Sequence, residues 1–242
     1  MNNKSSTEIV QSLVLKAKKA QSIFENFNQN QVDEIVTAVA WAICKPSNNE
    51  KISNLAVDIT GLGNANDKIL KNRRKTLGLL RDLKEIKTVG IINEDKEKGI
   101  IEIAKPVGVV AAVTPSTNPA ATPINNIINA LKTRNSIIVS PSPAGSKVFI
   151  DLLVLINIEL NKVGAPKNLI QTFDCDVTKE LTNELMENVD LVIVTGSLNN
   201  VKKAAKSGSK AIGVGQGNVT SIVDETADLE DAFKKIKMSK TF

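Results

Sequence analysis

The sequence predicts an α/β protein in which a helical segment and a β-hairpin precede a parallel sheet. Three observations lead to this prediction. Residues 1–87 have the spacing of amphipathic helices, and two short apolar runs then flank the charged turn NEDKEK. From residue 107 onward, nearly continuous apolar runs alternate with helix-sized segments, a pattern typical of parallel strands that helices cover on both faces.

The N-terminal region predicts four helices in succession. The first begins at Ser5, which has capping-box spacing to Glu8, and the second ends before Pro46. The third ends at Gly61, and the fourth, residues 67–87, is strongly basic. The apolar residues expected to face the core from the first two helices are Ile9, Leu13, Ala17, Ala20, Val32, Ile35, Val36, Val39 and Ile43.

The rest of the chain predicts the hairpin and the sheet. TVGII and GIIEIA form the two strands of the hairpin. Because crossovers between parallel strands are right-handed, the alternation that follows indicates a Rossmann-like sheet. Its expected strands are residues 107–113, 136–140, 169–173, 190–195 and 210–214, with 219–224 beyond them.

Composition narrows the possible functions. The 242 residues include no histidine, which excludes a His-based triad and a His metal site, so no metal is expected. Cys44 and Cys175 lie far apart, as in a reduced protein. The N-terminus has no apolar signal-peptide core and no run is long enough to cross a membrane, so we expect a cytoplasmic protein without a membrane partner.

The net charge of +5 comes from one segment. Residues 67–87 carry eight Lys or Arg against three acidic residues, a surplus of five. A solvated helix face is the favoured interpretation, and a surface for an anionic partner is the alternative. Nucleic acid is not expected there, because aromatic residues make up only 3% of the chain and base stacking needs exposed rings.

Four small, polar or glycine-rich loops follow the predicted strands: TPSTNP, PSPAG, TGS and GVGQGN. In a sheet of this type, ligands bind outside the carboxyl ends of the strands. Any one loop is explained as a tight turn, but four on one edge favour a nucleotide site, where backbone N–H groups approach a phosphate. GVGQGN is not the GxGxxG fingerprint and follows the fifth strand, so the usual dinucleotide motif is absent.

Several stretches resemble the aldehyde dehydrogenase superfamily, in order along the chain: KPVGVVAAVTPSTNP, ALKTRNSIIVSPSP, DLVIVTGS, KAIGVGQGNV and MSKTF. The resemblance runs from about residues 60–72 to the last residue and is specific to the coenzyme-A-acylating branch. NRRKTLGLLRDLK is further similar to the sulfoacetaldehyde dehydrogenases of that branch.

The resemblance implies a Rossmann-like domain that binds NAD without the GxGxxG loop; NADP is left open. A lysine beside the ribose in many hydrolytic members is replaced here by SPSP. The implied cofactor residues are Thr114, Pro115 and Ser116 beside the nicotinamide, Ser140, Pro141, Ser142 and Pro143 near the adenosine ribose, Thr195, Gly196 and Ser197 near the pyrophosphate, and Gly213, Gly215 and Gly217 of the last loop.

Asn118 matches the oxyanion-hole asparagine of the family. A side-chain amide that donates to the developing alkoxide stabilises a tetrahedral intermediate, whereas without the resemblance an Asn before Pro indicates a turn. Hydrolytic members have a glutamate base near Gly213, but residues 196–223 contain no carboxylate here. A thioester would therefore await coenzyme A rather than water.

The resemblance also implies a cysteine nucleophile shortly after the MSKTF stretch, whereas this sequence stops at Phe242. We therefore expect these residues to lack the catalytic domain and to be inactive alone.

They divide into the helical part of the cofactor domain (1–87), an oligomerisation-type hairpin (88–104) and the Rossmann-like NAD-binding domain (105–242). In the complete protein we expect a homo-oligomer acting on a small aldehyde, sulfoacetaldehyde or acetaldehyde, with coenzyme A. The alternative is a non-catalytic dinucleotide-binding module.

Overall fold

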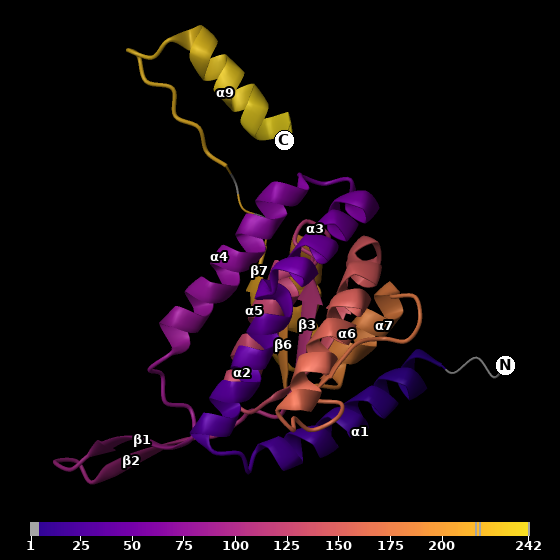
Figure 1. The fold of residues 1–242 in the computed structure, drawn as a ribbon, viewed down its shortest axis with the longest axis vertical. Helices are drawn as coiled ribbons and strands as arrows, with labels where there is room; N and C mark the ends of the chain where they lie inside the picture. Colours follow the sequence, from indigo (N-terminus) through magenta and orange to yellow (C-terminus); the bar gives the residue numbers. More distant parts are fainter. Residues whose placement is uncertain (1–4, 216, 218, 242) are drawn as a thin grey trace.

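The computed structural model describes residues 5–215, 217 and 219–241. It opens with four helices, as the sequence predicts (Figure 1). They are α1 (Ser6–Phe24), α2 (Gln29–Cys44), α3 (Pro46–Thr60) and α4 (Ala65–Leu83).

The ends of these helices follow the local signals in the sequence. Ser5 and Glu8 form the predicted capping box of α1, and Asn28 and Gln31 form a second one at α2. Gly61 ends α3 in the left-handed conformation, with φ of 64°. The core face of α2 is as predicted. On α1 the fully buried positions are Val10, Val14, Ala17, Ala20 and Phe24, whereas Ile9 and Leu13 are only half-buried.

A hairpin and a five-stranded sheet complete the fold. The antiparallel strands β1 (Gly90–Asp95) and β2 (Ile100–Ala104) project from the body of the protein (Figure 1). The elements that follow are β3 (Val109–Thr114), α5 (Ala121–Lys132), β4 (Ser136–Pro141), the short 3-10 helix η1 (Pro143–Gly145), α6 (Ser146–Lys162), β5 (Ile170–Gln171), α7 (Lys179–Glu187), β6 (Leu191–Thr195), α8 (Leu198–Lys206) and β7 (Lys210–Val214). The order is β5-β4-β3-β6-β7, with every pair parallel.

Two strand predictions are corrected. Residues 219–224 form no strand: the segment is exposed throughout, with Ile222 91% exposed, so it pairs with no described strand and has no core to cover. The strand predicted over 169–173 shortens to β5, because Thr172 turns its hydroxyl to donate to the carbonyl of Val139 at 2.9 Å. An apolar run alone therefore overestimates the length of an edge strand.

The central strand β3 is buried on both faces. Val110 and Ala112 pack into the cluster that contains residues of α2, α5 and α6. Val109, Ala111 and Val113 pack into the second cluster, which contains residues of α1, α7 and α8. The strand alternates between the two layers because successive side chains point to opposite faces.

Two side chains that immediately precede the neighbouring strands β4 and β6 fix the beginning of β3. Asn135 Oδ1 accepts the N–H groups of Val107 (2.7 Å) and Gly108 (3.0 Å). Asp190 Oδ2 accepts the N–H of Val109 at 2.7 Å. A Cβ atom at Gly108, where φ is +125°, would lie 2.3 Å from Asp190 Oδ2, so only glycine fits there.

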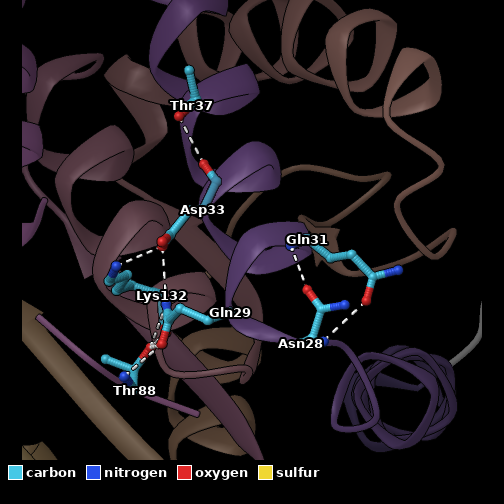
Figure 2. A network of polar contacts seen from close by, with 7 residues as sticks. All are labelled: Asn28, Gln29, Gln31, Asp33, Thr37, Thr88 and Lys132. Atoms are coloured by element: carbon cyan, nitrogen blue, oxygen red, sulfur yellow. Dashed lines mark hydrogen bonds and ion pairs between the residues drawn. The ribbon is translucent and has the colours of Figure 1, made fainter. Parts of the chain in front are cut away.

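A polar network joins α2, α5 and the segment before the hairpin (Figure 2). Lys132 donates to Asp33, and its side chain is only 4% exposed. Gln29 Nε2 also donates to Asp33, at 3.0 Å, and Gln29 Oε1 accepts the N–H of Thr88 at 2.8 Å. Thr88 in turn donates its hydroxyl to the carbonyl of Lys132. The network compensates the burial of the Lys132 cation.

The last helix, α9 (Leu229–Thr241), lies apart from the rest of the chain (Figure 1). None of its residues is buried, and Leu229, Phe233 and Met238 expose most of their apolar surface. Phe242 of the MSKTF stretch lies outside the described residues. Across the helices of the described part, none combines the length and apolar character that a membrane crossing requires.

The two partners of the Lys132–Asp33 pair should respond differently to mutation. Asp33→Ala leaves a buried cation without a carboxylate, so we expect a loss of about 2 kcal/mol, below the about 3–5 kcal/mol of a fully buried pair because Asp33 is 40% exposed. Lys132→Met leaves a carboxylate that water reaches and should cost less than about 1 kcal/mol. Urea unfolding of both variants measures the difference. Equal losses, or a larger loss for Lys132→Met, would contradict this account.

Candidate functional site

The carboxyl ends of three adjacent strands surround a cavity of about 510 Å³. The parallel register pairs Thr114 of β3 with Pro141 of β4, and Val113 with Val194 of β6, so the three exits lie side by side. The cavity brings together ten of the predicted site residues: Thr114, Pro115, Ser116, Ser140, Pro141, Ser142, Pro143, Thr195, Gly196 and Ser197.

Two helices begin at the wall of this cavity. Thr178 caps α7 by accepting the N–H of Leu181 at 3.1 Å, and Ser197 caps α8 by accepting the N–H of Asn200 at 3.3 Å. The first turn of each helix leaves backbone N–H groups without a helical partner and carries the positive end of the helix dipole. Both ends therefore favour an anionic ligand.

The polar side chains of the cavity add positive charge. Lys179 and Lys203 line it, and none of the described lining residues is acidic. Lys203 Nζ donates to Asn183 Oδ1 at 3.3 Å, which holds the ammonium at the wall. Among the described residues, the buried hydroxyl of Thr114 has no hydrogen-bond partner. The cavity thus offers cations, helix N-termini and a free hydroxyl to a ligand that carries phosphate.

Sequence reasoning missed the contribution of α7 and α8. Besides the two lysines, Thr182 lines the cavity and shares a 2.9 Å hydrogen bond with Ser140. For α8 the sequence contains a usable signal, because serine is a typical helix cap. A helix capped by Ser197 carries Lys203 nearly two turns later. For α7 no motif marks the helix start as part of the site.

The glycines of the last loop lie outside the cavity lining. Gly213 belongs to β7, where a Cβ atom would lie 2.6 Å from Cγ1 of Val201, so the glycine allows α8 to pack against the strand. Gly215 and Gly217 are exposed beyond the strand. Gln216 and Asn218 of the same loop lie outside the described residues.

Asn118 does not line this cavity. It lines a separate gap of about 10 Å³, together with Lys68, Lys71 and Asn72 of α4. The Oδ1 atom of Asn118 is buried and has no hydrogen-bond partner in the described part of the chain. The loop from Thr114 to Asn118 therefore contributes to two different places, the cavity at its beginning and this gap at its end.

Neither cysteine has the surroundings of a nucleophile. Cys44 is half-buried against the core, and burial raises the pKa of its thiol, with Arg73 opposing the shift weakly. At Cys175 partial burial again raises the pKa, and the carboxylates of Asp174 and Asp176 raise it further. Neither residue lines the cavity or the gap beside Asn118. A thiolate is disfavoured at both positions.

Comparison with known proteins connects this architecture to one family. The model of the aldehyde dehydrogenase family matches residues 2–242. A sulfoacetaldehyde dehydrogenase (acylating) of Cupriavidus necator is 53% identical over 97% of this chain and 48% of its own length. A succinate-semialdehyde dehydrogenase (acetylating) of Clostridium kluyveri is 43% identical over 94% of this chain and 49% of its own length.

The crystal structure of an acetylating aldehyde dehydrogenase from Geobacillus thermoglucosidasius has the same fold over the matched region. It superposes with a TM-score of 0.87 and 39% identity, covering 98% of this chain and 52% of the other. The chain thus spans about half the length of the curated relatives that it matches.

The packing role of Gly213 is testable. Gly213→Ala should destabilise the fold by about 1–3 kcal/mol, because the new methyl group meets Val201. Val201→Ala in the same background should recover much of the loss. Gly215→Ala is the matched control, because a Cβ atom there meets nothing within 4 Å, and it should change stability by less than about 0.5 kcal/mol. Thermal or urea unfolding distinguishes the variants, and additive losses in the double variant would argue against the contact.

Proposed function

This chain belongs to the aldehyde dehydrogenase family, and we propose that the protein oxidises an aldehyde with NAD and transfers the acyl group to coenzyme A. The balanced reaction is aldehyde, coenzyme A and NAD⁺ to acyl-CoA, NADH and a proton. The observation that carries the proposal is the lysine-lined cavity at the carboxyl ends of β3, β4 and β6, in a chain that is similar to acylating enzymes.

In this proposal the cavity holds the dinucleotide. The first turn of α8 and Lys203 bind the pyrophosphate, Thr114 to Ser116 border the nicotinamide, and residues 140–143 lie near the adenosine ribose. When bound, NAD accepts the hydride that the aldehyde carbon loses. The two lysines of the wall would also suit the extra phosphate of NADP, so both cofactors belong in the same assay.

Asn118 supplies the oxyanion contact. When a thiolate adds to the aldehyde, the carbonyl oxygen becomes an alkoxide, and the amide N–H of Asn118 donates a hydrogen bond to it. Because neither Cys44 nor Cys175 favours a thiolate, we propose that the nucleophile is not one of residues 1–242. The absence of a carboxylate from residues 196–223 supports coenzyme A rather than water as the acyl acceptor.

Sulfoacetaldehyde and acetaldehyde are the candidate substrates. The two curated relatives described above are named for sulfoacetaldehyde and succinate semialdehyde, both of which carry an anionic group at neutral pH. We propose sulfoacetaldehyde on this basis and on the likeness of NRRKTLGLLRDLK to the sulfoacetaldehyde branch.

Cofactor binding can be tested on the chain itself. Lys203→Ala should weaken NAD binding by tenfold or more, the loss expected when a charge-assisted hydrogen bond of about 1.5–3 kcal/mol is removed. Lys206→Ala is the matched control, because Lys206 lies on the same helix but not at the cavity. Isothermal titration with NAD and NADP gives both affinities. No binding by the wild-type chain, or equal effects of the two substitutions, would argue against the assigned cavity.

The reaction itself should be assayed with the full-length protein that the gene encodes. We expect NADH and acyl-CoA to form from aldehyde and NAD only when coenzyme A is present. Asn118→Ala should lower kcat by about 10²–10³-fold, the usual cost of one oxyanion-hole donor. Thr117→Ala, an exposed neighbour, is the control. Rapid NADH formation without coenzyme A would favour hydrolysis, and an unchanged kcat in Asn118→Ala would remove the oxyanion role.

A further inference from the structure

Helix α4 turns a polar stripe toward the interior. Its buried residues are Lys68, Asn72 and Thr76, spaced four apart on one side of the helix. A surface helix normally buries apolar residues on this side. The polar stripe of α4 therefore calls for a reason other than hydrophobic packing.

A buried hydrogen-bond network fixes α4 against α3. Asn72 Nδ2 donates to Asn49 Oδ1 at 3.0 Å and to Ser53 Oγ at 3.2 Å. Asn49 Nδ2 donates in return to the carbonyl of Ile69 at 2.9 Å. Because these bonds fix the rotation of α4 about its axis, they also fix the direction in which Lys68 and Lys71 leave the helix.

Lys68 has a buried side chain whose ammonium group has no counterion among the described residues. The residue is only 5% exposed, and no hydrogen bond or ion pair joins its ammonium group to the described part of the chain. Burial lowers the pKa of Lys68, and the neighbouring charge of Lys71 lowers it further. Burial and Lys75 lower the pKa of Lys71, with Asp67 opposing. Lysines are almost never buried without a partner, because desolvating an unpaired charge is costly.

The two lysines lie beside Asn118. Lys68, Lys71, Asn72 and Asn118 line the same gap of about 10 Å³, which has room for one water molecule. The buried Asn118 Oδ1 has no hydrogen-bond partner among the described residues, so the gap places an unsatisfied amide oxygen together with the two lysines. The lysine stems are long and flexible, so their ammonium groups can move toward a ligand that reaches Asn118.

We propose that Lys68 and Lys71 bind the anionic end of an aldehyde whose carbonyl oxygen is held by Asn118. This inference rests on the proposed function and narrows its substrate class to short aldehydes that end in a sulfonate or a carboxylate. Such an anion neutralises the repulsion between the two ammonium groups and compensates the burial of Lys68. A neutral aldehyde such as acetaldehyde leaves both cations unpaired, so the site disfavours it.

The test is the substrate preference of the full-length protein. The ratio of kcat/KM for sulfoacetaldehyde to that for acetaldehyde should fall at least tenfold in Lys68→Met and in Lys71→Met. Lys68→Arg should retain most of the preference, because it keeps the charge. Lys75→Met is the matched control, because Lys75 is exposed on the same helix and does not line the gap. Succinate semialdehyde in the same assay shows whether a carboxylate is accepted as well as a sulfonate.

The stability of the variants separates binding from folding. Because Lys68 is buried without a partner, Lys68→Met should unfold at a temperature equal to or higher than the wild type. A lowered preference in a protein of undiminished stability supports the proposal. An unchanged preference overturns it while leaving the proposed acylating activity intact.

A second measurement decides the inference if the full-length protein oxidises no aldehyde, which would refute the proposed function. Ethanesulfonate, an unreactive sulfonate, is titrated into the isotope-labelled chain, and the side-chain amide signals of Asn118 and Asn72 are followed by NMR. Shifts that saturate in the wild type and vanish in Lys68→Met support an anion site. Absence of shifts, or shifts that ethanol reproduces, would overturn it.

Discussion

The double-sided burial of β3 is the constraint on which the rest of the structure depends. This strand pairs with β4 on one side and β6 on the other, and helices cover both its faces. Asp190 accepts its first N–H group and Asn135 accepts the two N–H groups just before it, so its starting register is fixed by side chains as well as by the sheet. A strand held in this way fixes the position of the loop that follows it. Thr114, at the start of that loop, lines the cavity, and Asn118, at its end, lines the gap beside α4.

The sequence predicted most of the elements because local signals and packing agree in this chain. The capping box at Ser5, the end of α3 at Gly61 and the apolar face of α2 all appear where the residue pattern indicated. The failures occur where a pattern requires a partner that local sequence does not specify. Residues 219–224 are apolar enough for a strand but pair with no described strand, and β5 ends early because Thr172 bonds through its side chain.

The sequence predicted only the part of the site that the loops after the strands form. Parallel strands bring their carboxyl ends together whatever their sequence, so the loops after β3, β4 and β6 could be assigned to one cavity. Lys179 and Lys203 reach the same cavity from helices, and their positions depend on how α7 and α8 pack. The charge pattern of residues 67–87 favours a solvated helix face, and it does not distinguish Lys68 from the other lysines of the helix. Only the packing of α4 against α3 places the side of the helix that carries Lys68 inward.

A buried charge discriminates between substrates by a larger factor than the shape of a cavity does. A hydrophobic pocket separates substrates that differ by one methylene group by only about 10–200-fold, whereas a site built for a polar group rejects an analogue that lacks it by about 10⁴–10⁵-fold. The difference arises because the wrong ligand leaves a desolvated group without its partner. Lys68 is such a group, since its residue is only 5% exposed and its ammonium group has no counterion among the described residues. In the proposed site, an anion that reaches Asn118 would relieve that cost as it binds, which is why we propose a charged aldehyde rather than a neutral one as the substrate.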